Sequence, residues 1–135
     1  MSTIIVCYEE RPVADRMLER AAFMAKALDA SVVVTSVAPV LHSRGGPIDP
    51  VDPPARHETE ADEAAARLRE LGVAEVEAVS GVGNPARSIV ELAEARNAEL
   101  IVIGAHEGGL LSRVFQGDVG GDIVHAAPAD VLIVR

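Results

Sequence analysis

The sequence contains few aromatic residues, few basic residues and a single cysteine. With no tryptophan, one tyrosine and two phenylalanines, it offers no row of rings on which the bases of a single-stranded nucleic acid could stack. Its 12 lysines and arginines are outnumbered by 21 acidic residues, and the resulting net charge of −9 argues against a nucleic-acid-binding surface. Cys7 can form no disulfide within the chain, and because it lies in an apolar run we expect it to be buried as a small hydrophobe.

Long apolar runs and signal sequences are absent as well. No run approaches the roughly eighteen apolar residues that span a bilayer, and residues 1–10 lack the basic start and apolar stretch of a signal peptide. We therefore expect a cytoplasmic protein that does not contact a membrane. The chain has 135 residues, of which 49% are hydrophobic, so we expect one domain spanning residues 1–135.

Several motifs of catalysis and cofactor binding are also missing. No G-x-x-x-x-G-K-[ST] loop occurs, which argues against the usual phosphoryl-transfer machinery, and no serine lies in a G-x-S-x-G elbow. The histidines have no paired metal-ligand spacing, and we interpret His57 and His125 as solvent-facing helix residues. Residues 81–86 (GVGNPA) match a dinucleotide-binding fingerprint. No acidic residue ends the next strand, however, so a turn and a helix cap explain them better.

Short apolar segments alternate with helical patterns along the chain. Apolar runs predict four strands, at residues 3–8, 31–37, 99–103 and 130–134, and alternating charged and apolar residues predict a fifth, nearer an edge of the sheet, at residues 75–80. Apolar residues at helical spacing, together with capping residues, predict helices that begin near Pro12, His57, Pro85 and Gly117. Gly72 is expected to end the second helix, and Asn84 to cap the third. Residues 38–56 are rich in glycine and proline and predict a mobile surface loop within the domain.

This alternation predicts an α/β fold, with a single doubly wound, open, parallel five-stranded sheet and helices on both faces. In such folds, ligands bind outside the carboxyl ends of the strands, where the strand order reverses. If the first and fourth predicted strands are neighbours at that point, Glu9 and residues 104–118 converge there.

The glycine-rich segment between the last two strands carries the most information. A buried strand, glycines and a helix start expose backbone N–H groups that suit a phosphate or another anion. The pattern Gly104-x-x-Glu107, nine residues, then Gly117-Asp118 resembles the universal stress protein family, whose adenine-nucleotide-binding members carry G-x-x-G, nine residues, then G and Ser or Thr. The resemblance spans essentially the whole chain, including Glu9 after the first strand, the Gly-Asn-Pro turn, LIVIGAH and the closing APADVLIV. It implies an adenine nucleotide alpha-hydrolase-like fold.

The resemblance also implies a nucleotide site with a degenerate phosphate loop. Gly104 and Gly117 match the family's first and last glycines, whereas Glu107 and Asp118 replace a glycine and a hydroxyl residue. At the adenosine end it implies contacts from Glu9 and Val37. The candidate nucleotide-binding residues are Cys7, Glu9, Val37, Gly104, His106, Glu107, Gly117, Asp118 and Val119. The candidate ligands are ATP and AMP, and a state with no cofactor remains open.

The two carboxylates in the loop oppose phosphate binding. A carboxylate about 4 Å from a phosphate charge is unfavourable by roughly 1 to 4 kcal/mol, so two of them could lower the affinity by several powers of ten. Arg113 or a protonated His106 could offset part of this repulsion. Mg²⁺ bridging Glu107 and Asp118 to the phosphates could offset more, because carboxylate oxygens suit this cation. Asp118 also suits the N-cap of a helix, and this role is the favoured one, although the sequence leaves both roles open.

The end of the chain predicts a second interaction site. Val131, Leu132, Ile133 and Val134 form an apolar strand, and if it is an outer strand, its free edge is prone to pairing. The resemblance implies the same, because family members commonly dimerise through their last strands. We therefore expect a homodimer interface at these four residues.

Three functions remain open. The first is a homodimeric regulatory or protective module, not a turnover enzyme, with a weakened adenine-nucleotide site. The second is a nucleotide-free module that binds an unknown protein partner through residues 38–56. The third is a slow ATP hydrolase, which needs a base to activate water, and Glu9 and Glu107 are the obvious candidates.

Overall fold

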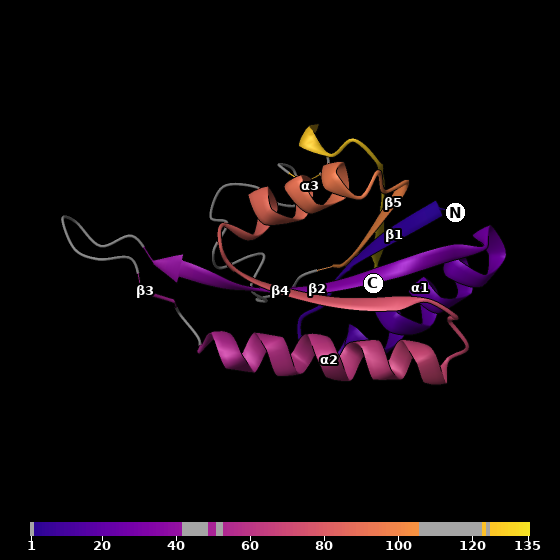
Figure 1. The fold of residues 1–135 in the computed structure, drawn as a ribbon, viewed down its shortest axis with the longest axis horizontal. Coiled ribbons are helices and arrows are strands. Elements are labelled where there is room, and N and C mark those ends of the chain that lie inside the picture. The colour runs from indigo at the N-terminus through magenta and orange to yellow at the C-terminus, as the bar shows by residue number, and fades with distance from the viewer. Residues whose placement is uncertain (1, 42–48, 51–52, 106–122, 124) are drawn as a thin grey trace.

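Parallel strands and helices alternate along the described part of the chain (Figure 1). The computed structural model describes residues 2–41, 49–50, 53–105, 123 and 125–135. In chain order, the elements are β1 (Ser2–Cys7), α1 (Ala14–Leu28), β2 (Ala30–Leu41), β3 (Asp49–Pro50), α2 (Pro54–Glu70), β4 (Val76–Gly83), α3 (Pro85–Ala95), β5 (Leu100–Gly104) and β6 (Asp130–Val134).

Five of the strands form a parallel sheet in the order β4-β2-β1-β5-β6. β1 lies in the middle and pairs with β2 from Ser2↔Ala30 to Cys7↔Thr35, while its other edge pairs with β5. After β4 the chain returns to this second edge, so the strand order reverses between β1 and β5. The predicted doubly wound sheet is therefore confirmed, and the condition that the first and fourth predicted strands are neighbours is met. The two-residue β3 adds an antiparallel pair at the far end of β2.

Helices cover both faces of the sheet, and each face has its own apolar core. α1 and α2 lie on one face, whereas α3 lies on the other (Figure 1). Since alternate residues of a strand point to opposite faces, Ile4 and Val6 pack with α1 and α2, whereas Ile5 packs with α3. β1 and β5 are thus apolar on both faces, which explains why their sequences are continuous apolar runs. Burying each such side chain contributes about 1.5–3 kcal/mol.

The predicted ends of the second and third helices agree closely with the structure. Asn84 caps α3, because its side-chain oxygen accepts a hydrogen bond from the Arg87 backbone N–H at 3.1 Å, and Pro85 is the first helical residue. Gly72 follows the end of α2 with a φ of +97°, a conformation that glycine adopts without strain. These local signals are readable from the sequence because they depend on residues close together in the chain.

Two predicted helix starts are wrong by two or three residues. Pro12 lies in a turn, in which the Ala14 backbone N–H donates to the Arg11 carbonyl at 2.9 Å, and α1 begins at Ala14. α2 begins at Pro54 instead of near His57, with a proline in its first turn, where no backbone donor is needed. Most of the predicted helix at residues 117–127 lies outside the described residues, although Ile123 and Ala126 are helical.

Residues 38–56 contain more regular structure than the sequence predicts. β2 continues to Leu41, because Ala38 and Pro39 extend the parallel pairing with β4, and β2 then pairs with β3. α2 already occupies residues 54–56. The predicted loop is therefore shorter than expected, and residues 42–48 and 51–52 lie outside the described residues.

β6 is an outer strand of the sheet among the described residues, since it pairs with β5 alone. Its predicted bounds, residues 130–134, are confirmed. β4 bounds the parallel sheet on the other side, as its alternating sequence predicts. In the part of the chain that the structure describes, no helix is both long and apolar enough to cross a bilayer.

Candidate functional site

A narrow hollow lies at the carboxyl end of β1, beside residues 35–37 of β2. Its cavity volume is about 40 Å³, and the empty space around it, open solvent included, is about 410 Å³. The lining residues are Cys7, Tyr8, Glu9, Thr35, Ser36, Val37, His57, Pro85 and Ile89. The Tyr8 backbone N–H donates to the Thr35 carbonyl at 2.8 Å, which carries the β1–β2 pairing beyond the end of β1. Mostly apolar walls with a few polar groups are typical of small-molecule sites.

Glu9 and the end of β5 come together through one arginine. A guanidinium nitrogen of Arg11 lies 3.9 Å from a Glu9 carboxylate oxygen, and another donates to the Ala105 carbonyl at 3.1 Å. Ala105 directly follows Gly104. The convergence of Glu9 with the start of the glycine-rich segment, expected from the sequence, is therefore found. The salt bridge is partly screened from solvent, with side-chain exposures of 14% for Arg11 and 27% for Glu9.

Two apolar candidates, Val37 and Cys7, line the hollow from β2 and β1. Val37 is buried, in register with Gly81 of β4. Cys7 packs beside the core under α3, and burial raises the pKa of its thiol to about 12. The thiol is therefore protonated at neutral pH and cannot act as a nucleophile. Its expected role as a small hydrophobe agrees with this environment.

Gly104 is placed where a side chain would collide with α1. A Cβ at this position would lie 2.9 Å from Val13 Cγ1 and 3.7 Å from Met17 Sδ. The glycine therefore allows β5 to end directly against the start of α1. Packing gives Gly104 a structural role, and its predicted contact with a nucleotide remains a prediction.

The remaining predicted phosphate and metal residues lie outside the described residues: His106, Glu107, Gly117, Asp118 and Val119. Within the described residues, no group of three or more His, Cys, Asp or Glu side chains could hold a metal ion. The predicted magnesium contacts of Glu107 and Asp118 therefore remain predictions.

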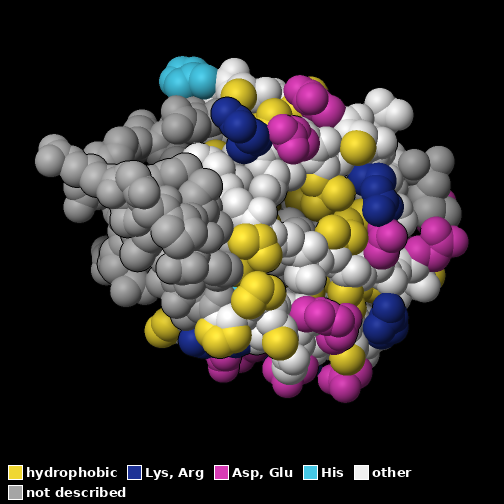
Figure 2. All heavy atoms as spheres, turned by 60° about the vertical axis from the view of Figure 1, so that its left-hand side comes forward, with side chains coloured by type: hydrophobic (Ala, Val, Ile, Leu, Met, Phe, Trp, Pro, Cys, Tyr) yellow, Lys and Arg dark blue, Asp and Glu magenta, His cyan; other side chains and the backbone are white. Residues whose placement is uncertain are grey.

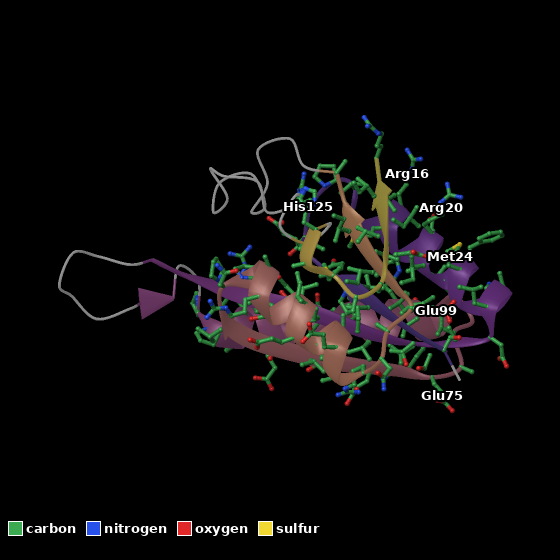
Figure 3. All side chains as sticks on the ribbon, turned by 90° about the horizontal axis from the view of Figure 1, so that it is seen from above. Arg16, Arg20, Met24, Glu75, Glu99 and His125 are labelled. Atoms are coloured by element: carbon green, nitrogen blue, oxygen red, sulfur yellow. The ribbon has the colours of Figure 1, made fainter. Side chains whose placement is uncertain are left out.

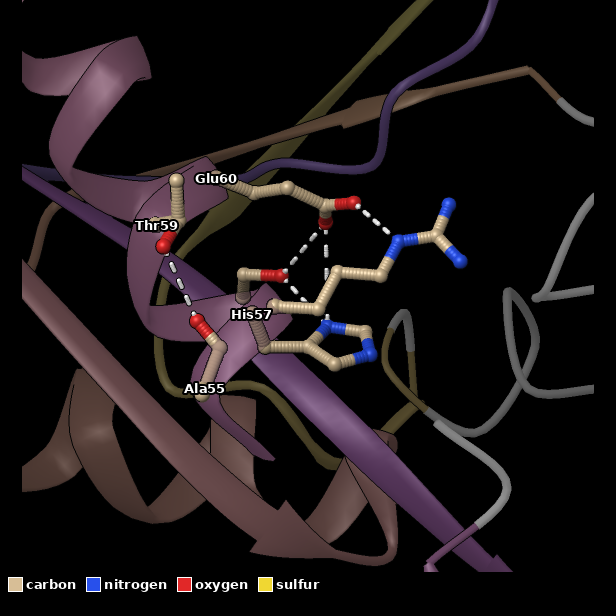
Figure 4. Close-up of polar contacts among 6 residues, drawn as sticks. Ala55, His57, Thr59 and Glu60 are labelled. Atoms are coloured by element: carbon tan, nitrogen blue, oxygen red, sulfur yellow. Dashed lines mark hydrogen bonds and ion pairs between the residues drawn. The ribbon is translucent and has the colours of Figure 1, made fainter. Parts of the chain in front are cut away.

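A buried polar cluster beside the hollow was not predicted from the sequence (Figure 4). Ser36 of β2, His57 and Glu60 of α2 have exposures of only 2%, 4% and 7%. The Ser36 hydroxyl lies 2.7 Å from His57 Nδ1 and donates to Glu60 Oε2 at 3.3 Å, while Arg56 Nε donates to Glu60 Oε1 at 3.1 Å. Among the described residues, no buried side-chain nitrogen or oxygen lacks a partner. The expectation that His57 faces solvent is therefore wrong.

A signal for this cluster exists in the sequence. His57, Ala61, Ala64 and Leu68 follow the helical spacing i, i+4, i+7, i+11, which places His57 on the buried face of α2. A histidine on an apolar helix face needs a polar partner, but its partner lies on a strand 21 residues earlier. Which strand residue meets it is set by tertiary packing. His125, in contrast, is exposed as expected.

Tyr8 contributes a further polar group, its phenolic hydroxyl, to the lining of the hollow. Burial, and next the carboxylates of Glu10 and Glu60, raise the pKa of its hydroxyl. Tyr8 therefore remains a neutral phenol that can both donate and accept a hydrogen bond. It packs against the core under α1 and α2 while lining the hollow.

The outer strand β4 presents a contrasting polar pair. Glu77 and Arg96 form two hydrogen bonds, one of them 3.1 Å long between Glu77 Oε1 and an Arg96 guanidinium nitrogen. The hydrogen bond from Arg96 lowers the pKa of Glu77, and both side chains are substantially exposed. Figure 2 shows acidic and basic side chains interspersed with apolar ones over the described part of one face, without a continuous basic patch.

The four predicted interface residues lie on the outer strand β6. Ile133 is 49% exposed, whereas Val134 is buried in the core. A groove of about 590 Å³ runs between β6 and α1. Arg16, Arg20 and Met24 extend from α1 along this groove beside β6 (Figure 3). The outer position of β6 is as expected, and pairing with a second copy remains a prediction.

Comparison with known proteins gives a consistent result over the full chain. A sequence model described as the Universal stress protein family matches residues 1–135. A relative from Thermus aquaticus, named "Universal stress protein in QAH/OAS sulfhydrylase 3'region", is 31% identical over 134 residues, which are 98% of both chains.

Solved structures give the same architecture. A universal stress protein crystallised in complex with cAMP is 25% identical, with a TM-score of 0.75 over 99% of this chain and 96% of that chain. A universal stress protein from Archaeoglobus fulgidus is 23% identical, with a TM-score of 0.78 over 100% of this chain and 94% of that chain. The second likeness supports the fold alone.

Proposed function

The chain belongs to the universal stress protein family, and from this membership we propose that it binds an adenine nucleotide, with the adenosine end in the hollow beyond β1 and β2. The observation that carries the proposal is that three candidate residues line one hollow: Cys7 at the end of β1, Glu9 in the segment that follows it, and Val37 of β2. The similar universal stress protein crystallised with cAMP supports the same class of ligand.

The chemistry of the lining fits an adenosine. The side chains of Val37 and Ile89 offer apolar contacts for the faces of a base, and the small Cys7 leaves room beside them. The Glu9 carboxylate accepts hydrogen bonds and therefore suits ribose hydroxyls. The cavity volume of the hollow is small, about 40 Å³, so in this proposal the edge of the base enters the hollow and the sugar lies at its mouth.

The phosphates, in this proposal, extend toward the residues after β5. Gly104, His106, Glu107, Gly117, Asp118 and Val119 are the proposed contacts. Because Glu107 and Asp118 repel phosphate, ATP binds weakly without metal, and Mg²⁺ held between the two carboxylates strengthens the binding. AMP carries fewer phosphate charges and is less affected.

Calorimetric titration with AMP, ADP and ATP, each with and without Mg²⁺, tests this proposal. We expect AMP to bind both with and without Mg²⁺, and ATP to bind tightly only when Mg²⁺ is present. The double variant Glu107→Gly, Asp118→Ser should raise ATP affinity without metal by about tenfold or more, since it removes two repulsive charges. Tight binding of ATP to the unmodified chain without metal would contradict the proposal that the two carboxylates weaken phosphate binding. Binding of no nucleotide would contradict the proposed function.

We further propose that β6 pairs with β6 of a second copy and that the dimer acts as a regulatory or protective module in the cytoplasm. Two features support the pairing: among the described residues β6 pairs with β5 alone, and Ile133 is exposed. Replacing Ile133 by lysine should shift the molecular mass in analytical ultracentrifugation from dimer to monomer. A Val82→Lys variant on the outer strand β4, where Val82 is also exposed, is the matched control.

The alternative function is a nucleotide-free module that binds a protein through residues 38–56. The extension of β2 to Leu41 and its antiparallel pairing with β3 carry this segment beyond the parallel sheet (Figure 1). Deleting residues 42–48 should abolish capture of a protein partner if this function is correct, and should leave nucleotide titrations unchanged.

A further inference from the structure

Arg11 lies between the hollow and the end of β5, and it belongs neither to the sequence motif nor to the described lining of the hollow. We propose that its guanidinium binds the phosphate next to the ribose, so that the site holds a nucleoside monophosphate without metal. This inference rests on the nucleotide site proposed above. It names the cation that offsets the phosphate charge and the class of nucleotide that such a cation suits.

The order of the strands sets the direction in which a nucleotide lies in the proposed site. β2, β1 and β5 are successive neighbours in the sheet. The base contacts Val37 of β2, and the ribose contacts Glu9, which follows β1. Because the 5′-phosphate is joined to the ribose through one methylene group and one oxygen, it continues in the same direction, from the end of β1 toward the end of β5.

The Arg11 side chain spans this step from β1 to β5. Its Nη1 lies 3.9 Å from Glu9 Oε2, and its Nη2 donates a hydrogen bond to the Ala105 carbonyl at 3.1 Å. Ala105 directly follows β5 (Leu100–Gly104). The cation is therefore beside the proposed ribose contact, on the side toward which the phosphate extends.

Backbone hydrogen bonds fix both ends of this arrangement. The Arg11 carbonyl accepts from the Ala14 backbone N–H at 2.9 Å, at the start of α1. The Ala105 backbone N–H donates to the Val134 carbonyl at 2.6 Å, which ties the peptide that Arg11 contacts to β6. A cation held in place before the ligand arrives loses little freedom on binding, which favours affinity.

The guanidinium retains donors for a ligand. It carries five N–H donors, and within the described part of the chain the structure gives it one hydrogen bond, to Ala105. The contact with Glu9 is an ion pair, and at 3.9 Å it is too long for a hydrogen bond. The Arg11 side chain is only 14% exposed, so its attraction for an anion is less screened by water than that of a surface arginine.

The charges along this path suit a single phosphate. One guanidinium can bind one phosphate through two parallel hydrogen bonds. A second or third phosphate needs further cations, whereas the sequence after Ala105 supplies the carboxylates Glu107 and Asp118. The contact with Arg11 therefore stabilises a monophosphate, and additional phosphates gain nothing from it.

Calorimetric titration with adenosine and with AMP, both without metal, tests the proposal, because these ligands differ by the phosphate alone. We expect AMP to bind the unmodified chain about tenfold or more tightly than adenosine, as for a charge-assisted hydrogen bond. In Arg11→Met the ratio of the two affinities should fall to about one, since the group that holds the phosphate is gone. Arg11→Lys keeps the charge but loses the paired donors, so it should retain part of the preference.

The ratio of affinities separates a contact with phosphate from a role in folding, because a general disturbance of the site lowers both affinities alike. Arg16→Met is the matched control and should keep the preference for AMP, since Arg16 is an exposed arginine of α1 that lines the groove beside β6. An unchanged ratio in Arg11→Met overturns the proposal and leaves the nucleotide site intact. Binding of neither ligand to the unmodified chain overturns the nucleotide site, and this proposal with it.

A double variant separates direct contact from neutralisation of Glu9. If Arg11 only cancelled the charge of Glu9, the preference for AMP would return in Glu9→Gln, Arg11→Met, because no carboxylate would then need a partner at this position. We expect the double variant to show no preference, and Glu9→Gln alone to keep it. A returned preference in the double variant overturns the direct contact.

Titration with ADP and ATP without metal tests the class of nucleotide. We expect neither ligand to bind the unmodified chain more tightly than AMP, because Arg11 serves one phosphate and the sequence beyond Ala105 adds negative charge. A gain of about tenfold or more from AMP to ATP would overturn the assignment of a monophosphate.

Discussion

The carboxyl ends of the central strands and the outer strand β4 contain the same kinds of residue in opposite surroundings. Gly104 ends β5 against α1, whereas Gly81 of β4 has no atom within 4 Å of the place where a side chain would begin. Glu60 is nearly buried and Glu77 is exposed, although each is bonded to an arginine. The difference between the two regions therefore lies in burial and not in composition.

Burial sets how strongly each group constrains the molecule. An exposed ion pair contributes about 0–1 kcal/mol, because water competes for both partners. A buried polar group that loses its partner is destabilising by about 1–3 kcal/mol. Changes at the central carboxyl ends should therefore have large effects, and the same changes on β4 should have small ones.

The largest contrast is expected for thiol reactivity. Burial raises the pKa of Cys7 to about 12 from an ordinary value of 9.0, so its thiolate is about a thousandfold scarcer at neutral pH. Alkylation of Cys7 by iodoacetamide, followed by mass spectrometry, should be slower by about this factor than alkylation of a thiol introduced by Ser80→Cys on β4 in a Cys7→Ala background. Ser80 is exposed. Similar rates at the two positions would contradict the raised pKa of the partly buried Cys7 thiol.

The next contrast concerns the two glycines. Gly104→Ala places a Cβ 2.9 Å from Val13 Cγ1, so the free energy of unfolding should fall by about 1–3 kcal/mol, as measured by urea denaturation. Gly81→Ala should change it by no more than about 0.5 kcal/mol. Adding Val13→Ala to Gly104→Ala should recover part of the loss, because it removes the colliding methyl group. Equal effects at the two glycines would show that contact with α1 is not the cause.

A smaller contrast is expected for the two carboxylates. Glu60→Gln keeps the shape of the side chain but replaces an acceptor oxygen by a donor, so either Ser36 or Arg56 loses its bond. The free energy of unfolding should fall by about 1–3 kcal/mol. Glu77→Gln should lower it by about 0–1 kcal/mol. Chemical denaturation of both variants at neutral pH checks the difference, and an equal loss in both would contradict the argument from burial.

The smallest effect is the pH dependence of the exposed pair. The hydrogen bond from Arg96 lowers the pKa of Glu77 below its ordinary value of 4.5. The pair therefore stabilises the fold at pH values above 4.5, and this contribution is lost as the pH falls through the lowered value. The difference in stability between the unmodified chain and Glu77→Gln should be below about 1 kcal/mol at neutral pH and vanish in strong acid. A difference in stability that persists in strong acid would show that the Glu77–Arg96 pair is not its cause.

The architecture of this chain could be predicted largely from local patterns. The strands β1, β5 and β6 are apolar runs, of which β1 and β5 lie in the core, and Asn84 with Pro85 marks a helix start through bonds to near neighbours. The adjacency of β1 and β5 was only assumed as a condition, because the rule of right-handed crossovers limits the possible strand orders without choosing one. The extension of β2 could not be predicted. Its pairing with β4 overrides the preference of the local sequence at Ala38 and Pro39 for a loop.

The site could be predicted in part. Glu9 and Val37 were assigned through resemblance, and both line the hollow. The Ser36, His57 and Glu60 cluster was missed because the row of charged residues on α2 masks the buried face on which His57 lies. A strand hydroxyl and a helix imidazole 21 residues apart leave no spacing motif, since their contact depends on how α2 packs on β2.

The central position of β1 bears on how the chain is made. β1 is synthesised well before β5, although one of its edges pairs with β5 at residues 100–104. A nascent chain therefore holds an apolar strand with one unpaired edge until β5 has emerged from the ribosome. Such edges favour intermolecular pairing. We therefore expect a ribosome-associated chaperone to bind the chain during this interval.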